Sequence, residues 1–285
     1  MINKFLNRLE VEKKYSKNTI DAYRTDLTQF EKFVHKKLNK NLEDVTRDDV
    51  ISFLKHLANR NCSATTSNRK LAAIKSFYKF LLMEGVVKVN PAELIESAKI
   101  EETIPRVVSI EEYKHIMSIV DTLEERALIE LLFATGLRRE EIVTLKRNNF
   151  SFNPGILKIH GKGNKERIIP IIPEIIPNVM LWLEQHDSEW VFPSKRNKGT
   201  HNTVRWVNKV VKKWANKAGY PDITPHSFRH AFGTHLYENG ADVKAIQEMM
   251  GHKSIDTTNI YAQSSVKRNR QEFIKAHPLL IKRPE

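Results

Sequence analysis

Only one stretch of this 285-residue chain has the pattern of β-strands. Two runs rich in β-branched residues, 156–160 and 167–171, flank the polar turn 161–166, which reads Gly-Lys-Gly-Asn-Lys-Glu. Such runs on either side of a glycine-containing turn predict an antiparallel hairpin, and a third strand is expected near Phe150. Elsewhere the apolar residues recur at helical spacing. The chain is therefore expected to be mainly α-helical, with one small antiparallel β-sheet.

The first hundred residues carry helical patterns alone. Apolar residues recur at intervals of three and four over 2–9, 20–34, 50–57 and 71–81. Ser16 stands where a helix N-cap is expected, and Asn90-Pro91 predicts the start of a last short helix. We assign 1–98 to a helical domain, 99–108 to a charged linker that contains Pro105, and 109–285 to a second domain.

The second domain also reads as mostly helical. A capping box, Ser109 with Glu112, opens its first helix, and Gly136 is expected to end a buried helix over 123–135. Further helices are expected over 173–186 and 200–218. Thr224-Pro225 begins another, which Asn239-Gly240 ends, and a short helix over 242–250 follows.

Composition narrows the class of protein. The formal net charge of +13 favours a polyanionic partner, with nucleic acid ahead of an anionic membrane. Cys62 is the only cysteine, so no intrachain disulfide is expected. The N-terminal segment lacks the apolar core of a signal peptide, and no run of about 18 apolar residues is present. We expect a cytoplasmic protein without a membrane span.

The last third of the chain concentrates the residues suited to chemistry. His226 and Arg229 lie three residues apart on one helix face, His252 follows Gly251, and Tyr261 comes nine residues later. Cationic and hydrogen-bonding groups near a phenol suit work on a phosphodiester. Taken singly, each has an ordinary structural explanation. His226 with His230 has zinc-ligand spacing, but no glutamate stands at the second position of an H-E-x-x-H motif.

Two further basic residues are placed to meet an anion. Arg138 follows a glycine turn at a helix start, where it either points inward at an anion or pairs with Glu140 or Glu141. Lys162 lies between two glycines in the hairpin turn. Glycines let the backbone approach a phosphate and leave this lysine mobile, although a basic turn without function has the same pattern.

The order and spacing of these motifs resemble the tyrosine recombinases, in particular the Xer type. The resemblance rests on HSFRH, AFGTHLYENGADVKAIQEMMGH and TTNIY, on TGLRREEI, and on GKGNKER between the strands. The segments SKNTIDAYRTDL and TTSNRKLAAIKSFY are similar to the core-binding domain of the same family. The resemblance implies an N-terminal SAM-like helical domain and a C-terminal catalytic domain that together form a C-shaped clamp on DNA.

The resemblance also implies a role for each catalytic candidate. Tyr261 would be the nucleophile that forms a 3′-phosphotyrosyl link. Arg138 and Arg229 would grip the phosphate oxygens, and His252 would donate a further hydrogen bond. His226 would accept the phenol proton, and Lys162 would protonate the leaving 5′-oxygen. Neither a metal nor another cofactor is implied.

Candidate DNA contacts cluster at two helix starts and in the hairpin turn. Hydroxyl, amide and basic groups at helix N-termini suit phosphate and base-edge contacts, although capping and a solvated surface explain them equally well. These candidates are Lys17, Asn18, Thr65, Asn68, Arg69, Lys70 and Lys165.

The biology implied is resolution of chromosome or plasmid dimers at a dif-like site, through a Holliday junction and a tetramer. The tail from about residue 265 would contact a neighbouring protomer, or else fold back in cis. A DNA translocase is a further candidate partner. The main alternative is an integrase or resolvase of a mobile element. A catalytically inactive DNA-binding protein and a metal-dependent nuclease are the remaining ones.

Overall fold

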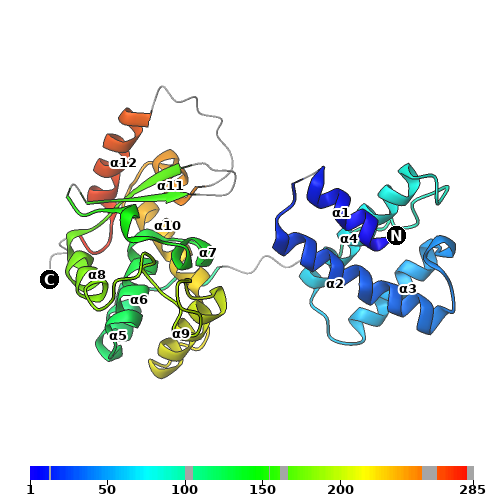
Figure 1. Cartoon of the computed structure of the whole chain (residues 1–285), viewed down its shortest axis with the longest axis horizontal. Helices are drawn as coiled ribbons and strands as arrows, with labels where there is room; N and C mark the ends of the chain where they lie inside the picture. The colour runs from blue at the N-terminus through cyan, green and yellow to red at the C-terminus, as the bar shows by residue number, and fades with distance from the viewer. Residues whose placement is uncertain (13, 100–104, 154, 161–165, 252–261, 281–285) are drawn as a thin grey trace. The chain divides into compact units, whose positions relative to one another are not determined.

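The computed structural model describes residues 1–12, 14–99, 105–153, 155–160, 166–251 and 262–280, without the side chains of 262–268. The chain divides into two compact units, Met1–Thr103 and Ile104–Glu285. In Figure 1 the first unit runs from blue to cyan and the second from green to red. The division falls within 99–108, the stretch that the sequence analysis assigned to a linker.

The first unit is helical. Its elements are α1 (Ile2–Val11), α2 (Lys17–Phe33), the π-helical turn η1 (Val34–Leu38), the 3-10 turn η2 (Leu42–Asp44), α3 (Arg47–Ala58) and α4 (Ala64–Met83). Ser16 caps α2 by accepting a hydrogen bond from the backbone of Thr19. The apolar helix faces meet in one core, where Phe30 packs edge to face against Phe53 and Tyr78.

The short helix expected at Asn90-Pro91 is absent from this described segment. Residues 91–94 form turns instead, with backbone hydrogen bonds from Glu93 to Asn90 and from Ile95 to Ala92. The Asn90 side chain accepts from the Ala92 amide and donates to the Lys75 carbonyl of α4. Side-chain bonds of this kind compete with helix formation, and only a few residues remain before the chain leaves the unit.

The second unit combines helices with the small sheet. Its elements are α5 (Ile110–Ile119), α6 (Leu123–Thr135), α7 (Arg139–Val143), η3 (Arg147–Asn149), β1 (Phe150–Ser151), β2 (Ile156–His160), β3 (Glu166–Pro170), η4 (Pro173–Ile175), α8 (Ile176–Leu183), α9 (Val204–Lys217), α10 (Pro225–Glu238), α11 (Val243–Met250) and α12 (Ala262–Ala276).

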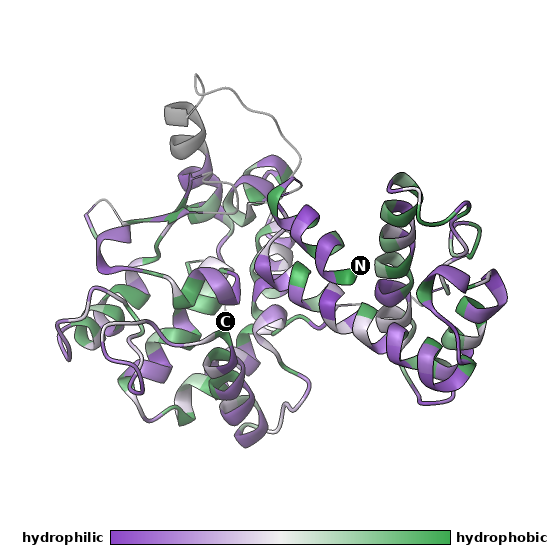
Figure 2. Cartoon of the chain, turned by 45° about the vertical axis from the view of Figure 1, so that its right-hand side comes forward, coloured by the Kyte–Doolittle hydropathy of each residue, from purple (hydrophilic) through white to green (hydrophobic). Residues whose placement is uncertain are grey.

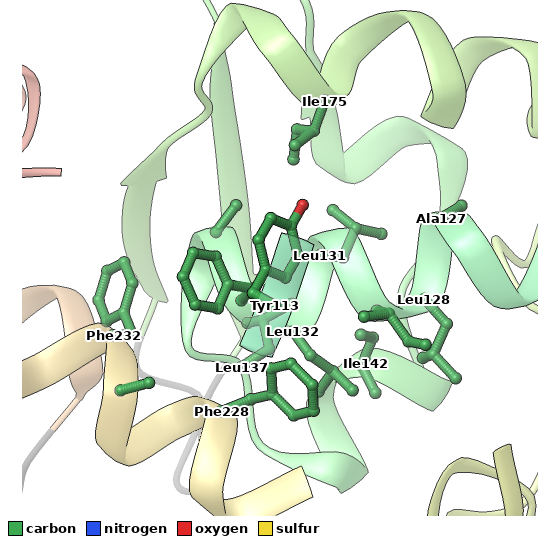
Figure 3. Close-up of a cluster of buried hydrophobic side chains, with 14 of the residues drawn as sticks. Tyr113, Ala127, Leu128, Leu131, Leu132, Leu137, Ile142, Ile175, Phe228 and Phe232 are labelled. Carbon is green, nitrogen blue, oxygen red and sulfur yellow. The ribbon is translucent and has the colours of Figure 1, made fainter. Parts of the chain in front are cut away.

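Helix α6 is the centre of the second core. Every residue from Ala127 to Thr135 is buried, and α5, α8, α9 and α10 all contact this helix. Tyr113 of α5 stacks on Phe133, with ring centroids 4.0 Å apart. Figure 3 shows Tyr113, three leucines of α6 (Leu128, Leu131 and Leu132) and Phe228 of α10 in one cluster. Figure 2 shows hydrophobic and hydrophilic residues on different faces of the helices in both units.

The predicted sheet is present, with the expected third strand. The strand order is β1-β2-β3, and both pairs are antiparallel. Along β2, Leu157 and Ile159 are buried whereas Lys158 and His160 are exposed, as the two-residue period requires. In the register of the hairpin, Arg167 of β3 lies opposite Ile159. Directly opposed residues of an antiparallel pair lie on the same face, so Arg167 shares the face of the buried Ile159.

The helix expected over 173–186 is shorter and begins with a different geometry. Residues Pro173–Ile175 form η4, and α8 ends at Leu183. The side chain of Arg147 explains this end, because its guanidinium donates hydrogen bonds to the carbonyls of Leu183, His186 and Ser188. These carbonyls are thereby satisfied without a further helical turn.

The C-terminal helix α12 packs against its own chain. It contacts α10, α11 and β3, and Phe273 and Ala276 are buried in the core of the second unit. His277, just beyond the helix, is fully buried against Phe232 and Phe273. Of the two arrangements considered for the tail, the described part from 269 to 280 adopts the one folded back in cis.

Candidate active site

The turn between α6 and α7 brings the first arginine into place. Gly136 has φ +58°, the left-handed conformation that ends a helix, and a β-carbon there would lie 2.7–2.9 Å from atoms of the Phe232 side chain. The turn therefore fits closely against α10 only because residue 136 has no side chain. Arg138 follows as the N-cap of α7, beside the end of α11.

Helix α10 supplies the second arginine. Thr224 and Ser227 cap its start reciprocally, and Pro225 occupies the first turn, as expected from the sequence. Arg229 is 5% exposed. Its Nη1 donates to the Gly136 carbonyl at 2.7 Å and its Nη2 to the Met250 carbonyl at 2.6 Å. Burial, followed by the charge of Arg138, lowers the pKa of Arg229 to about 10, so the group stays charged at neutral pH.

Arg138 points toward the same place. Its Nη2 donates to the Gly251 carbonyl at 3.0 Å, and its Nη1 donates to Glu141 Oε1 at 3.0 Å. The neighbouring Arg139 is exposed and donates to Asn208 of α9. Of the two adjacent arginines, Arg138 is therefore the one that lies with Arg229. The salt bridge to Glu141 and the inward orientation, considered as alternatives for Arg138, occur together.

Arg167 is the residue of this cluster that the sequence analysis missed, whereas Glu141 was named there only as an alternative salt-bridge partner of Arg138. Arg167 Nη1 and Nη2 lie 2.7 and 2.8 Å from the two carboxylate oxygens of Glu141, and its Nε donates to the Met249 carbonyl at 2.8 Å. Burial alone would raise the pKa of Glu141, but the bonds and charges of Arg167 and Arg138 lower it to about 2. Arg167 stood inside a strand and was assigned only to the hairpin.

Three guanidinium groups thus converge on the last carbonyls of α11. Arg167, Arg229 and Arg138 bind the carbonyl oxygens of Met249, Met250 and Gly251, respectively. The C-terminal end of a helix carries partial negative charge, so cations are stabilised there. The only carboxylate bonded to these arginines among the described residues is Glu141. The site therefore holds an excess of fixed positive charge and suits a phosphate anion.

His226 occupies the first turn of α10, on the surface. Its ring lies edge to face against His230, with centroids 4.4 Å apart. Partial burial, and then the charges of His230 and Arg229, lower the pKa of His226. A neutral imidazole at neutral pH is able to accept a proton. In the part of the chain that is described, no cluster of three or more His, Cys, Asp or Glu is placed to hold a metal ion.

Four predicted site residues lie outside the described residues: Lys162, Lys165, His252 and Tyr261. Their described neighbours are the strand ends His160 and Glu166, the turn residue Gly251, and the start of α12. Gly251, with φ +66°, ends α11 directly beside the arginine cluster. The segment that carries His252 and Tyr261 therefore begins at the carbonyls that the arginines bind.

Helix α9 carries a basic face that the sequence analysis overlooked. Its inward residues form the predicted core stripe, while Arg205, Lys209 and Lys212 are exposed and the helix contains no acidic residue. These three lie at intervals of four and three, on one side of the helix. Asn208 on the same helix accepts the bond from Arg139, so this face adjoins α7. The absence of acids over 204–217 was the signal in the sequence.

The DNA-contact candidates of the first unit divide into two groups. Lys17, Asn18 and Thr65 are exposed at the starts of α2 and α4. Arg69 and Lys70 instead both bind Asp26, a fully buried carboxylate of α2.

Lys70 itself is 6% exposed, with its ammonium 2.7 Å from Asp26 Oδ1. This burial turns the charge of Lys70 away from any surface ligand, so its observed role is internal. Asn68 exchanges two hydrogen bonds with the backbone of Ala98, and its amide thereby holds the end of the unit against α4.

Comparisons with known proteins agree with this architecture. Residues 106–268 match the phage integrase family, and residues 2–85 match the phage integrase N-terminal SAM-like domain. Tyrosine recombinase XerC of Leptospira interrogans is 36% identical over 96% of this chain and 92% of its own length. Tyrosine recombinase XerD of Staphylococcus epidermidis is 33% identical over 98% of both chains.

Solved structures support the fold. XerH recombinase bound to a palindromic difH substrate in a post-cleavage complex has a TM-score of 0.72, with 22% identity over 96% of this chain and 83% of that one. The Tn1549 transposon integrase in complex with a circular intermediate DNA has a TM-score of 0.71, with 16% identity over 94% of this chain and 98% of that one.

Among the described residues, no helix has both the length and the hydrophobicity needed to span a lipid bilayer. Family match and near full-length relatives together establish that this chain belongs to the phage integrase family of tyrosine recombinases and is a site-specific DNA recombinase.

Proposed function

We propose that this recombinase cleaves and rejoins DNA with Tyr261 as nucleophile and with Arg138 and Arg229 as the principal phosphate ligands. The arginine cluster at the end of α11 carries the proposal, because it concentrates fixed positive charge ten residues before Tyr261. Guanidinium groups bind the non-bridging oxygens of a phosphate in a fixed geometry and stay charged at every working pH.

The reaction follows from the chemistry of these groups. The Tyr261 hydroxyl oxygen attacks phosphorus, and the bond from phosphorus to the 5′-oxygen breaks, which leaves a 3′-phosphotyrosyl link. A phenol has an ordinary pKa of about 10, so its proton needs an acceptor, which is His226 in this proposal. Lys162 returns a proton to the leaving 5′-oxygen, and His252 donates to the phosphate. Arg138 and Arg229 stabilise the charge that develops on the oxygens.

The covalent link conserves the energy of the phosphodiester. Attack by the 5′-hydroxyl of another strand therefore rejoins DNA without a nucleotide cofactor, and two successive exchanges pass through a Holliday junction. Four protomers across two duplexes supply the four tyrosines needed. We further propose that both units contact the duplex, with Lys17, Asn18, Thr65 and the basic face of α9 on the phosphates.

The substrate in this proposal is a dif-like site, whose recombination resolves chromosome or plasmid dimers in the cytoplasm. The curated relatives that match nearly the whole chain carry Xer names, and the XerH structure holds a difH substrate. An integrase of a mobile element is the second candidate, since the Tn1549 transposon integrase has the same fold. Recombination assays with a chromosomal dif-like sequence and with transposon ends distinguish the two.

The proposed contact of the tail with a neighbouring protomer needs a test other than removal of the whole tail. Because Phe273 and His277 are buried in their own unit, a chain cut before residue 265 would lose part of its core as well as any contact. A chain that ends at Leu280 keeps this core and removes only 281–285. Unchanged tetramer assembly of that shorter chain on DNA would contradict a contact in trans by the last five residues.

A covalent-trapping assay tests the proposed chemistry. The protein is incubated in EDTA with a nicked suicide substrate drawn from a pool selected by binding. We expect a covalent adduct from the wild type and none from Tyr261→Phe. Tight binding without an adduct would favour the inactive DNA-binding protein, whereas cleavage only with added metal would favour a nuclease. An adduct that persists in Tyr261→Phe would refute the assignment of the nucleophile.

A further inference from the structure

All the nitrogen atoms of the Arg167 side chain donate hydrogen bonds, which its place in a strand does not require. Its side chain is 10% exposed, and its Nε, Nη1 and Nη2 atoms all donate. The acceptors come from two elements distant in sequence, Glu141 of α7 and the carbonyl of Met249 in α11. One guanidinium therefore joins β3, α7 and α11. Lysine, with a single nitrogen, is unable to reproduce this planar set of bonds.

The turn at Gly251 packs directly on this guanidinium. A β-carbon at Gly251 would lie 3.2 Å from both Cδ and Nη1 of Arg167. The position of Arg167 thus depends on the same turn whose carbonyl receives Arg138. A change at Arg167 would be transmitted to that turn and to Glu141 together.

Glu141 is shared unequally between two arginines. Arg167 binds both of its oxygens, at 2.7 and 2.8 Å, whereas the Arg138 side chain makes one bond at 3.0 Å and keeps its Nη2 on a neutral carbonyl. A bidentate pair is stronger than a single bond. The charge of Glu141 is consequently balanced chiefly by Arg167, and the charge of Arg138 is only partly compensated.

We propose that Arg167 is a positioning residue that prevents Glu141 from neutralising Arg138. Without Arg167, Glu141 would be left buried with Arg138 as its one bonded cation among the described residues, and Arg138 would turn to pair with it. Arg138 would then bind a phosphate less well. This proposal rests on the proposed role of Arg138 as a phosphate ligand, and it assigns Arg167 no contact with DNA.

The first test measures single-turnover cleavage of the suicide substrate. Arg167→Gln is expected to slow adduct formation about 100-fold, the usual effect of a misplaced reacting group, while DNA affinity changes less than about threefold. The double variant Arg167→Gln/Glu141→Gln also lacks the competing carboxylate, and we expect it to cleave about tenfold faster than Arg167→Gln. A bond that served only stability would show no such rescue, because the double variant loses more bonds than the single one.

The matched control is Arg147→Gln. Arg147 also binds backbone carbonyls within the second unit, but on α8 and the loop after it, and it has no bond to the arginine cluster among the described residues. If Arg147→Gln slows cleavage as much as Arg167→Gln, or if the double variant is no faster than Arg167→Gln, the proposal is wrong.

A second measurement needs neither cleavage nor a known DNA site. Inorganic sulfate serves as the anion probe, and the rise in melting temperature with sulfate is recorded for each variant. We expect the rise to be smaller in Arg138→Gln and Arg167→Gln than in wild type and Arg147→Gln, and to recover in the double variant. Recovery without any wild-type adduct would sustain the inference but contradict the proposed function. If the wild type forms an adduct but the double variant recovers neither cleavage nor the sulfate response, the proposed function would stand and the inference about Arg167 would be wrong.

Discussion

Each unit of this recombinase contains a buried carboxylate that binds two basic residues, and the two clusters have opposite outcomes. In the first unit, Asp26 holds Arg69 and Lys70, and the ammonium is buried with the acid. In the second, Glu141 holds Arg138 and Arg167, while Arg229 lies nearby and has only carbonyl partners among the described residues.

The difference shows when a buried base is available to a ligand. Asp26 holds the ammonium of Lys70 inside the protein and leaves the Arg69 side chain 45% exposed, so the Lys70 charge stabilises the fold. Three guanidinium groups lie around Glu141, and backbone carbonyls hold them in place without cancelling their charge. Basic residues with similar sequence patterns therefore serve structure in one unit and, as we propose, anion binding in the other.

Breaking the Asp26 cluster is expected to have the largest effect on stability. Asp26→Asn leaves Lys70 buried without a countercharge, and loss of one partner of a buried ion pair costs about 3–5 kcal/mol. Urea unfolding of the first unit measures this loss. Glu84→Gln, which breaks the more exposed ion pairs with Lys4 and Arg8, is the control and should cost much less. Equal losses in the two variants would contradict the contrast between buried and exposed pairs.

Replacing Arg229, the buried arginine beside Glu141, should instead affect catalysis. Arg229→Gln removes a charged donor that, in the proposed mechanism, stabilises the developing anion, and we expect cleavage to slow about 100- to 1,000-fold. The rate of adduct formation at saturating protein measures this effect. DNA affinity should change much less, since most phosphate contacts remain. A loss confined to affinity would show that Arg229 acts before the chemical step.

A third buried carboxylate, Glu130 of α6, sharpens the comparison because its one hydrogen bond among the described residues comes from a neutral group. Asn178 donates to Oε1, and Oε2 has no partner among the described residues. Burial raises the pKa of Glu130 from its ordinary value of 4.5 to about 7. Below pH 4.5 the acid is protonated in both states. Between pH 4.5 and 7 only the unfolded chain loses the proton, so stability falls, and the full penalty of about 3 kcal/mol applies above pH 7.

Glu130→Gln should therefore stabilise the second unit at pH 8 by up to about 3 kcal/mol and do little at pH 4.5. Denaturant unfolding at the two pH values tests this expectation. Glu124→Gln is the control, because Glu124 is also buried but has the ammonium of Lys195 as a partner. An equal gain at both pH values would show that ionisation of Glu130 is not the cause.

The smallest expected effect concerns the exposed basic face of α9. Lys209→Gln should weaken DNA binding similarly for all sequences and reduce the slope of log affinity against log salt by about 1. Lys213→Gln is the control, since the Lys213 ammonium already pairs with Glu125. Binding measured at several salt concentrations gives both slopes. Identical changes in the two variants would contradict a specific role for Lys209.

Short-range patterns predicted the elements well. The end of α6 at Gly136, the hairpin between β2 and β3, and the caps of α2 and α10 all follow from residues within a few positions of one another. The failed helix at Asn90-Pro91 is also informative. There a side-chain bond to α4, fifteen residues away, competes with the local preference.

The sequence by itself determined the fold class, the family and which residue types are candidates for the chemistry. The tertiary structure alone decided the partner of each charge. Arg229 reaches a carbonyl 93 positions away and Arg138 one 113 positions away, while Lys70 meets Asp26 across 44 positions. Helical spacing specifies which face a residue occupies but not what packs against that face. Whether a base is neutralised or left available therefore depends on contacts that only the folded chain creates.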